Sequence, residues 1–107
     1  MFSDLDIAKG YLNKAQSAKD RDLDFELSFS FYKRCLNKKR CYYTNKLMDR
    51  SSKELAPTLE RLDPKIGYTE SNTVVVCKLA NSIKSVWEHS DISINDIERM
   101  IKKLKKR

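Results

Sequence analysis

Glycine and proline are scarce in this sequence, with only two of each in 107 residues. Extended linkers and low-complexity segments are rich in these residue types, so their scarcity argues against both. No apolar run approaches the roughly 18 residues that a membrane-spanning helix needs. The acidic N-terminal MFSDLD lacks the basic and apolar parts of a signal peptide. We therefore expect one small domain over residues 1–107, located in the cytoplasm and without a membrane partner.

Cysteine is also infrequent, and the spacing of the three cysteines matters more than their number. Structural zinc sites often use two Cys-x-x-Cys pairs. Here Cys41 begins CYYT and Cys77 begins CKLA, so each pair lacks its second thiol. Cys35, six residues before Cys41, is expected inside a helix. We predict three reduced, buried thiols and no structural zinc.

Acidic residues are outnumbered, with 22 Lys and Arg against 15 Asp and Glu, which gives a net charge of +7. Such a balance favours polyanionic partners, among which nucleic acid is the commonest. Five basic residues cluster near the end of a predicted helix: Lys33, Arg34, Lys38, Lys39 and Arg40. They suit either stabilisation of the helix C-terminus or contact with phosphates. An anionic membrane is disfavoured, because no basic amphipathic helix carries an aromatic face.

Hydrophobic spacing predicts two helices within residues 1–40. The first covers Asp4–Lys19, with Ser3 and Asp6 as a capping box and Phe2 packed on Ile7. Its buried stripe would contain Ile7, Ala8, Tyr11, Leu12, Ala15 and Ala18. Residues 22–28 alternate as an extended segment does. A second helix then follows a cap at Ser28 or Ser30 and continues to Lys38.

Residues 41–88 alternate between strand and helix patterns. RCYYTNKLM favours a strand or hairpin arm, and residues 51–57 a loop. Strands are predicted over Thr58–Leu62 and Asn72–Val76, with Gly67 closing the turn, and a helix over Lys78–Glu88. Its expected core face contains Leu79, Ala80, Ile83, Val86 and Trp87, and its opposite face contains Asn81, Lys84, Ser85 and Glu88. A final helix over residues 93–107 begins at Ser93, with Asp96 as its box partner, and continues to about Leu104.

The segment TLERLDPKIGYTESNTVVVCKLANSIK, residues 58–84, carries the most functional information. Glu60 on a strand and Asn81 on a helix supply hard oxygen donors of the kind that bind Mg²⁺. The segment closely resembles the ββα-metal finger of HNH-type nucleases, with its pattern Leu-Asp-(His or Arg)-Ile-Asp, Gly-Tyr, Asn-Val, Cys, Asn and Lys. AKDRDLDFELS and CYYTNKLM also resemble the family, including small phage-encoded members. The resemblance covers about Ala18–Lys84.

The resemblance implies an α+β fold in which helices surround an HNH-like finger at residues 41–88. It implies that Glu60 and Asn81 bind Mg²⁺ or Mn²⁺, that Asn72 braces the finger loop, and that Lys84 approaches a phosphate. Arg61 falls where the most active members have the histidine that activates water. Because a guanidinium stays protonated, Arg61 cannot accept that proton, although it can stabilise charge on a phosphate. Neither His89 nor Tyr68 is well placed to replace the histidine as general base.

Two functions follow from the resemblance. The first is a DNA endonuclease or nickase with metal-dependent phosphodiester hydrolysis. Its activity is expected to be impaired, because the loss of a general base typically slows hydrolysis about 10²–10⁴-fold. The second is a catalytically inactive protein that binds double-stranded DNA or a host protein as a regulator or inhibitor, in the host cytoplasm if it is phage-encoded. An RNA-directed module stays open. Without the motif, Glu60 would be read as a strand residue paired with Lys or Arg.

Overall fold

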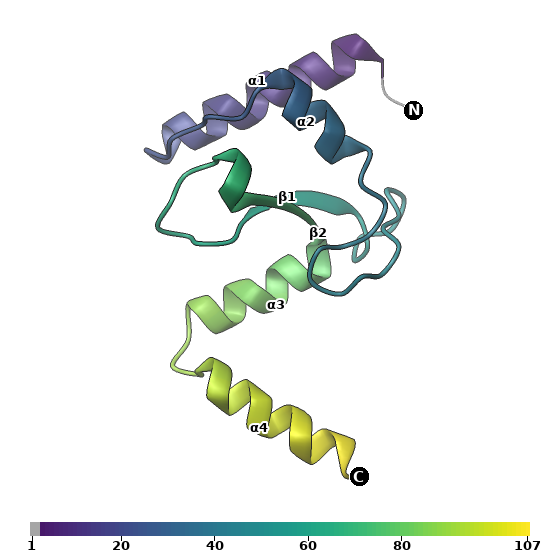
Figure 1. Ribbon diagram of the computed structural model, residues 1–107, viewed down its shortest axis with the longest axis vertical. Coiled ribbons are helices and arrows are strands. Elements are labelled where there is room, and N and C mark those ends of the chain that lie inside the picture. Colours follow the sequence, from purple (N-terminus) through teal and green to yellow (C-terminus); the bar gives the residue numbers. More distant parts are fainter. Residues whose placement is uncertain (1–2) are drawn as a thin grey trace.

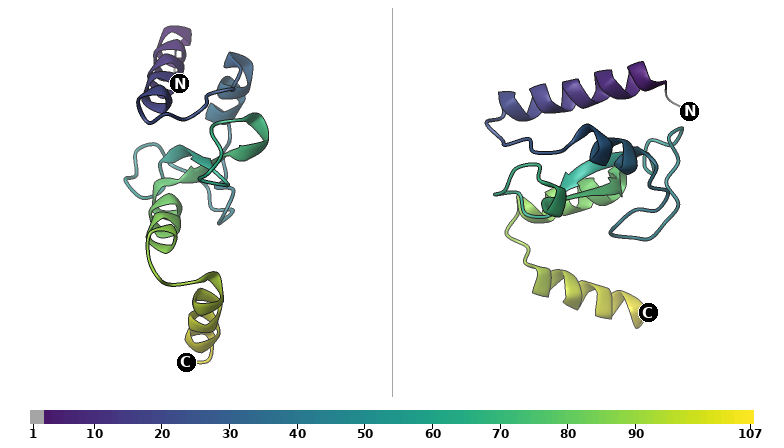
Figure 2. Two further views of the ribbon diagram at one scale, coloured as in Figure 1. Left: turned by 90° about the vertical axis from the view of Figure 1, so that its left-hand side faces the viewer. Right: turned by 45° about the horizontal axis from the view of Figure 1, so that its top comes forward.

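The computed structural model describes residues 3–107 of the chain. Its elements follow one another along a molecule of 50 × 30 × 21 Å. Helices α1 and α2 lie at one end, a two-stranded hairpin and helix α3 follow, and helix α4 forms the other end (Figures 1 and 2). The fold is a small α+β domain, as predicted. None of the helices in this part of the chain is long and apolar enough to span a membrane.

Helix α1 (Asp4–Asp20) begins where the capping pattern predicts, because the Ser3 hydroxyl accepts the N–H of Asp6 at 3.1 Å. The predicted contact of Phe2 lies outside the described residues. The expected buried stripe is wrong in extent: Ala18 is the one buried residue of the helix, and Leu12 is 64% exposed. The short element beneath α1 covers only part of its apolar face.

That element is helix α2 (Phe29–Leu36), which ends two residues before the predicted Lys38. The Ser28 hydroxyl caps it by accepting the N–H of Phe31 at 3.0 Å. Asp22 lies in a turn with φ 56°, and the segment after it is extended at Phe25, which forms a parallel bridge with Tyr68. The sequence-based expectation for this segment is confirmed in part.

Residues 41–48 form a turn with no assigned strand, so the predicted strand is wrong, whereas the hairpin alternative is confirmed in part. Arg40 and Leu47 form an antiparallel bridge, and the N–H groups of Cys41 and Met48 donate to the carbonyls of Lys46 and Lys39. The turn closes because the N–H of Asn45 donates to the carbonyl of Cys41 and the Arg40 guanidinium donates to the carbonyl of Asn45, both at 2.8 Å. Its tyrosines, typical of strands, project from an irregular segment instead.

Strands β1 (Pro57–Arg61) and β2 (Thr73–Cys77) form an antiparallel hairpin, each one residue from its predicted bounds. Glu60 pairs with Val74, and Arg61 with Thr73. A 3₁₀ turn, η1 (Glu70–Asn72), leads into β2, and helix α3 (Lys78–Glu88) follows β2 directly, with the predicted bounds.

Two small cores lie around this hairpin. Cys41, Val76, Cys77 and Ala80 form one, and Ala18, Leu27 and Tyr68 form the other. The first core joins the 41–48 turn to β2 and α3, and the second joins α1 and the extended segment to the loop after β1. The hairpin thus connects the two ends of the molecule.

Helix α3 is rotated relative to the prediction. Of its expected core residues, Ala80 is buried, whereas Leu79, Ile83 and Val86 are 42%, 62% and 67% exposed. The side chains of Lys84 and Glu88, on the face predicted to lie opposite the core residues, are only 10% and 17% exposed. The reason is that the helix directs its charged face toward β1, where an oppositely charged partner compensates for the burial.

Helix α4 (Ile94–Lys105) has the predicted capping box, in which Ser93 and Asp96 exchange hydrogen bonds. None of its residues is buried, and Ile94, Ile101 and Leu104 are 51%, 44% and 53% exposed. The helix extends away from the hairpin in both views (Figures 1 and 2).

Gly67 allows the loop after β1 to lie directly against the backbone of residues 24–26. The N–H of Tyr68 donates to the carbonyl of Asp24 at 2.8 Å, and the N–H of Glu26 donates to the carbonyl of Tyr68 at 2.7 Å. A Cβ atom at position 67 would lie 2.5 Å from the carbonyl oxygen of Asp24 and 2.8 Å from its nitrogen. These are backbone atoms, so they cannot move aside cheaply.

We predict that Gly67→Ala lowers the free energy of unfolding by about 1–3 kcal/mol, because residues 24–26 must shift. Gly10→Ala is the matched control: its Cβ would meet only the hydroxyl end of Tyr32, and alanine is favoured over glycine in a helix by up to about 1 kcal/mol. Thermal unfolding followed by circular dichroism measures both. Equal losses in the two variants would contradict the role given to Gly67.

Candidate active site

Glu60 projects from β1 toward α3 and meets the side chain of Lys84. The Lys84 ammonium lies 3.7 Å from Glu60 Oε2 and 3.0 Å from Glu88 Oε2, and it donates to the backbone carbonyl of Arg61 at 2.9 Å. The three side chains are 10–17% exposed. The other carboxylate oxygen of Glu60 accepts the N–H of Arg61 at 2.8 Å. Three oxygens from two elements therefore converge on one cation, and that cation is an ammonium.

Asn81 lies one helical turn before Lys84, so both residues occupy the same face of α3. Asn81 is half-buried, and its amide makes no hydrogen bond with another residue in the described part of the chain. Within residues 3–107 no group of three or more His, Cys, Asp and Glu side chains is arranged to hold a metal ion. Any metal at this site would depend on one or two carboxylates together with amide or carbonyl oxygens.

The structure does not bring Arg61 to the same face as Glu60, because consecutive strand residues point to opposite sides. The Arg61 guanidinium donates to the carbonyls of Pro64 and Ile66, at 2.6 and 3.2 Å, and lies 5.6 Å from the ring centre of Tyr68. The sequence-based expectation that Arg61 contacts the same phosphate as the Glu60 site is not supported by this geometry. Arg61 instead holds the turn after β1.

Asn72 closes that turn from the other side. Its amide nitrogen is within 3.1–3.3 Å of the carbonyls of Asp63, Ile66 and Gly67, and its amide oxygen accepts the N–H of Asp63 at 2.9 Å. The side chain is 7% exposed. Asn72 and Arg61 together tie the loop between the strands, and they thereby fix the end of β1 that carries Glu60.

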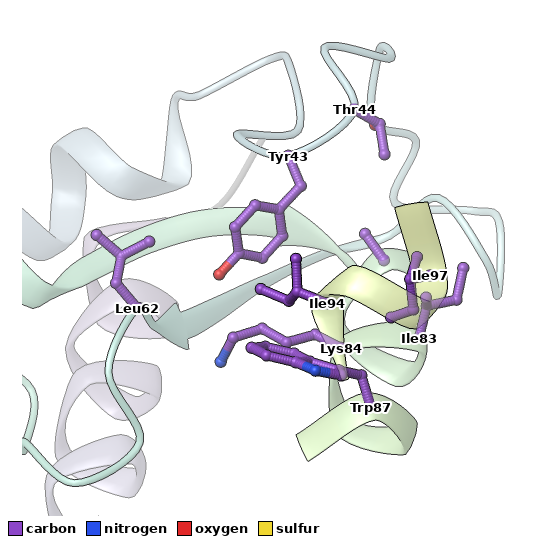
Figure 3. A pocket seen from close by; sticks show the side chains of 9 residues that line it. Tyr43, Thr44, Leu62, Ile83, Lys84, Trp87, Ile94 and Ile97 are labelled. Carbon is purple, nitrogen blue, oxygen red and sulfur yellow. The ribbon is translucent and has the colours of Figure 1, made fainter. Parts of the chain in front are cut away.

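Tyr43 lies beside the same charges, although sequence analysis gave it no role there. Burial raises the pKa of Tyr43, and the carboxylates of Glu60 and Glu88 raise it further. A hollow of about 480 Å³ opens here, lined by Tyr43, Lys84, Trp87 and apolar residues of α3 and α4. In Figure 3 the Tyr43 ring lies across the hollow from Lys84 and Trp87. Trp87, expected in the core, is half-buried in the wall of this hollow.

His89 is not part of this arrangement. Its Nδ1 lies 2.8 Å from the backbone carbonyl of Ser85 at the exposed end of α3. Glu88 is the residue that sequence analysis missed. Its signal is the four-residue spacing from Lys84, the spacing at which opposite charges meet on a helix.

The basic residues at positions 33–40 differ in their partners. Lys33 pairs with Asp4 at 3.8 Å, and Arg34 with Glu70 at 3.9 Å. Arg34, Lys38 and Arg40 line a hollow of about 540 Å³ beside β2, and Lys38 and Lys39 line another of about 480 Å³. Lys38 and Lys39 form no ion pair with another described residue. Arg40 likewise forms no ion pair within the described part of the chain, and its guanidinium donates to the carbonyl of Asn45.

The three cysteines are free and buried, as predicted. Cys41 and Cys77 share one core, and each is 2% exposed. Burial acts to raise the pKa of the Cys41 thiol. Hydrogen bonds from the Thr44 hydroxyl and from the backbone N–H groups of Cys77, Thr44 and Tyr43 outweigh it and lower the pKa to about 7. Thr44, which stands where a second thiol would complete the pair, thus stabilises the thiolate of the first.

Comparison with known proteins finds a relative in a bacteriophage. Over 69 residues, or 64% of this chain, the sequence is 36% identical to an uncharacterized 29.0 kDa protein from the dda-modA intergenic region of Enterobacteria phage T4. The matched part is 28% of that protein, so the chain spans less than a third of its length. No family model matches the chain, and no solved structure matches it.

We predict that stability rises between pH 7 and pH 9 through Cys41. Because its pKa is about 7 in the folded chain and 9.0 ordinarily, the unfolded chain binds more protons in this range. The contribution, of about 2 kcal/mol, is complete above pH 9 and lost as the pH falls through 7. Urea unfolding under reducing conditions measures it, and Cys41→Ser should flatten the rise. Cys35→Ser is the control, because burial raises the pKa of that thiol; an unchanged slope in Cys41→Ser would refute the assignment.

Proposed function

We propose that this protein is a DNA-binding, HNH-type endonuclease or nickase whose hydrolysis of phosphodiester bonds depends on Mg²⁺ or Mn²⁺. The observation that carries this proposal is the convergence of the Glu60 carboxylate with oxygens from α3 and β1 on a single cation. The donors are hard oxygens, which suit Mg²⁺ and Mn²⁺. The order strand, loop, strand and helix in the structure is compatible with an HNH-like finger.

Glu60 and Asn81 would hold the metal, the first from the hairpin and the second from the helix. A bound divalent ion supplies electrostatic stabilisation of the phosphate and of the leaving oxygen. Asn72 positions the end of β1 through its four hydrogen-bonding contacts with the loop. Lys84 lies beside Glu60, from where its ammonium can approach a phosphate.

Turnover should be slow, because no strong general base lies at this site. Arg61 faces the opposite side of β1, and the His89 ring is engaged at the end of α3. The loss of a general base typically slows hydrolysis about 10²–10⁴-fold. Glu60 is also one methylene longer than the aspartate usual in the family, and a displacement of about 1 Å can cost roughly 10²-fold when geometry is tight.

We predict weak nicking of supercoiled plasmid in the presence of Mn²⁺ or Mg²⁺ that Glu60→Ala abolishes. The matched control is Glu98→Ala, which removes an exposed carboxylate from α4 and should leave nicking unchanged. Chelation of the metal should stop nicking by the unaltered protein. Nicking that persists in Glu60→Ala would rule out this site as the source of activity.

A second candidate is a catalytically inactive, HNH-like protein that binds DNA or a host protein as a regulator or inhibitor. The position of Arg61 favours it, because the residue at the usual base position is bound to the loop carbonyls. The net charge of +7 serves this function as well as the first. Binding without metal-dependent cleavage would distinguish this candidate from the nuclease.

We predict that the affinity for double-stranded DNA falls steeply as the salt concentration rises. The double variant Lys38→Gln/Lys39→Gln should reduce this dependence of the affinity on salt. If both lysines contact phosphates, the slope of log affinity against log salt should fall by roughly 2. Lys9→Gln/Lys19→Gln, two exposed positions on α1, is the charge-matched control. Fluorescence anisotropy over a salt series gives the slopes, and equal slopes for the two double variants would exclude Lys38 and Lys39 from the interface.

A further inference from the structure

We infer that Lys84 and a divalent metal compete for Glu60, and that Glu88 is a positioning residue which holds the Lys84 ammonium when the metal takes its place. This inference rests on the proposed role of Glu60 as a metal ligand. It assigns functions to Lys84 and Glu88 that follow from where the structure places their charges.

The Lys84 ammonium lies among three oxygen atoms. Glu60, Glu88 and the Arg61 carbonyl surround Lys84 Nζ at 3.7, 3.0 and 2.9 Å. A Lys ammonium has three donors and no acceptor. The Arg61 carbonyl and Glu88 Oε2 lie within hydrogen-bond distance of it, whereas Glu60 Oε2 is a longer ion-pair contact. The Glu60 oxygen that faces α3 is therefore already neutralised by a cation.

The two carboxylate contacts of the Lys84 ammonium differ in length and in the element that supplies the carboxylate. Glu88 is the nearer carboxylate, and it belongs to the same helix, four residues after Lys84. That pairing needs only the helix to form. The Glu60 contact is longer and depends on the packing of β1 against α3. The longer contact is the one that can be released while Lys84 keeps its ion pair with Glu88.

The charges of the cluster explain why the contact between Lys84 and Glu60 can be released. Two carboxylates face one ammonium, so the cluster has an excess negative charge that a further cation can neutralise. A divalent ion on Glu60 would repel an ammonium within about 4–6 Å. Lys84 can lower this repulsion by moving toward Glu88, because its side chain has a flexible four-carbon stem.

The test measures Mn²⁺ binding by titration calorimetry, with the emission of Trp87 as a second readout. Trp87 is the sole tryptophan of the sequence and lines the same hollow as Lys84. We expect Lys84→Met to bind Mn²⁺ roughly tenfold more tightly, because the variant lacks the positive charge that repels the metal ion. A neighbouring charge typically changes the binding of an ion to a carboxylate by about 1–3 log units. Glu88→Gln should bind about tenfold more weakly, because the ammonium then has only Glu60 as a carboxylate partner.

The double variant Lys84→Met/Glu88→Gln separates competition from net charge. It carries the same net charge as the unaltered cluster but lacks the competing ammonium, so it should still bind Mn²⁺ more tightly than the unaltered protein. It also avoids leaving two carboxylates facing each other, which protects the fold if Lys84→Met alone unfolds. Lys78→Met, at the exposed start of α3, is the control for loss of a lysine from this helix.

The outcomes separate this inference from the nuclease proposal. If the unaltered protein binds Mn²⁺ through Glu60, but neither variant lacking Lys84 binds more tightly, competition is refuted while the metal site stands. If no variant binds Mn²⁺, competition is refuted as well, and the cluster is a structural ion pair. If binding tightens as expected but the unaltered protein never nicks DNA, competition is supported and the nuclease proposal fails.

Discussion

The ammonium of Lys84 determines how the central part of this protein is assembled. A charge that is nine-tenths buried requires compensation, and here two glutamates and a backbone carbonyl provide it. Because two of these groups belong to the hairpin, the polar face of α3 is turned toward β1. Leu79, Ile83 and Val86 of α3 are consequently left exposed, although Ala80 is buried, which differs from the usual arrangement of an amphipathic helix on a sheet.

The same constraint separates two residues that are neighbours in the sequence. Glu60 faces α3, and the alternation of a regular strand sends Arg61 to the opposite side. There Arg61 binds the loop carbonyls and lies beside Tyr68. The site therefore combines two carboxylates with one ammonium, and the ring of His89 lies apart from it at the end of α3.

Local signals in the sequence were sufficient for most of the elements. Serines at positions 3, 28 and 93 each cap the helix that was predicted after them, and α3 has the predicted bounds. The turn at 41–48 was mistaken for a strand because its tyrosines have high strand propensity, whereas long-range contacts decide its shape. The orientation of α3 could not be derived from helical periodicity, because a buried ion pair outweighed the preference of its apolar residues. Asn72 and Glu60 could be selected by their motif, and Glu88 by its four-residue spacing from Lys84, whereas the approach of this pair to Glu60 depends on packing between β1 and α3.

The bridge between Phe25 and Tyr68 has a consequence for how the chain acquires its structure. The loop braced by Asn72 closes through contacts between residues close in sequence, so it can form early. The N-terminal helices, in contrast, find their docking partner only after residue 68 has been synthesised, and contacts of such sequence separation form slowly. During translation residues 3–40 must therefore wait for this contact, while Tyr11 can already pack against Phe25, Phe29 and Tyr32 within the same segment.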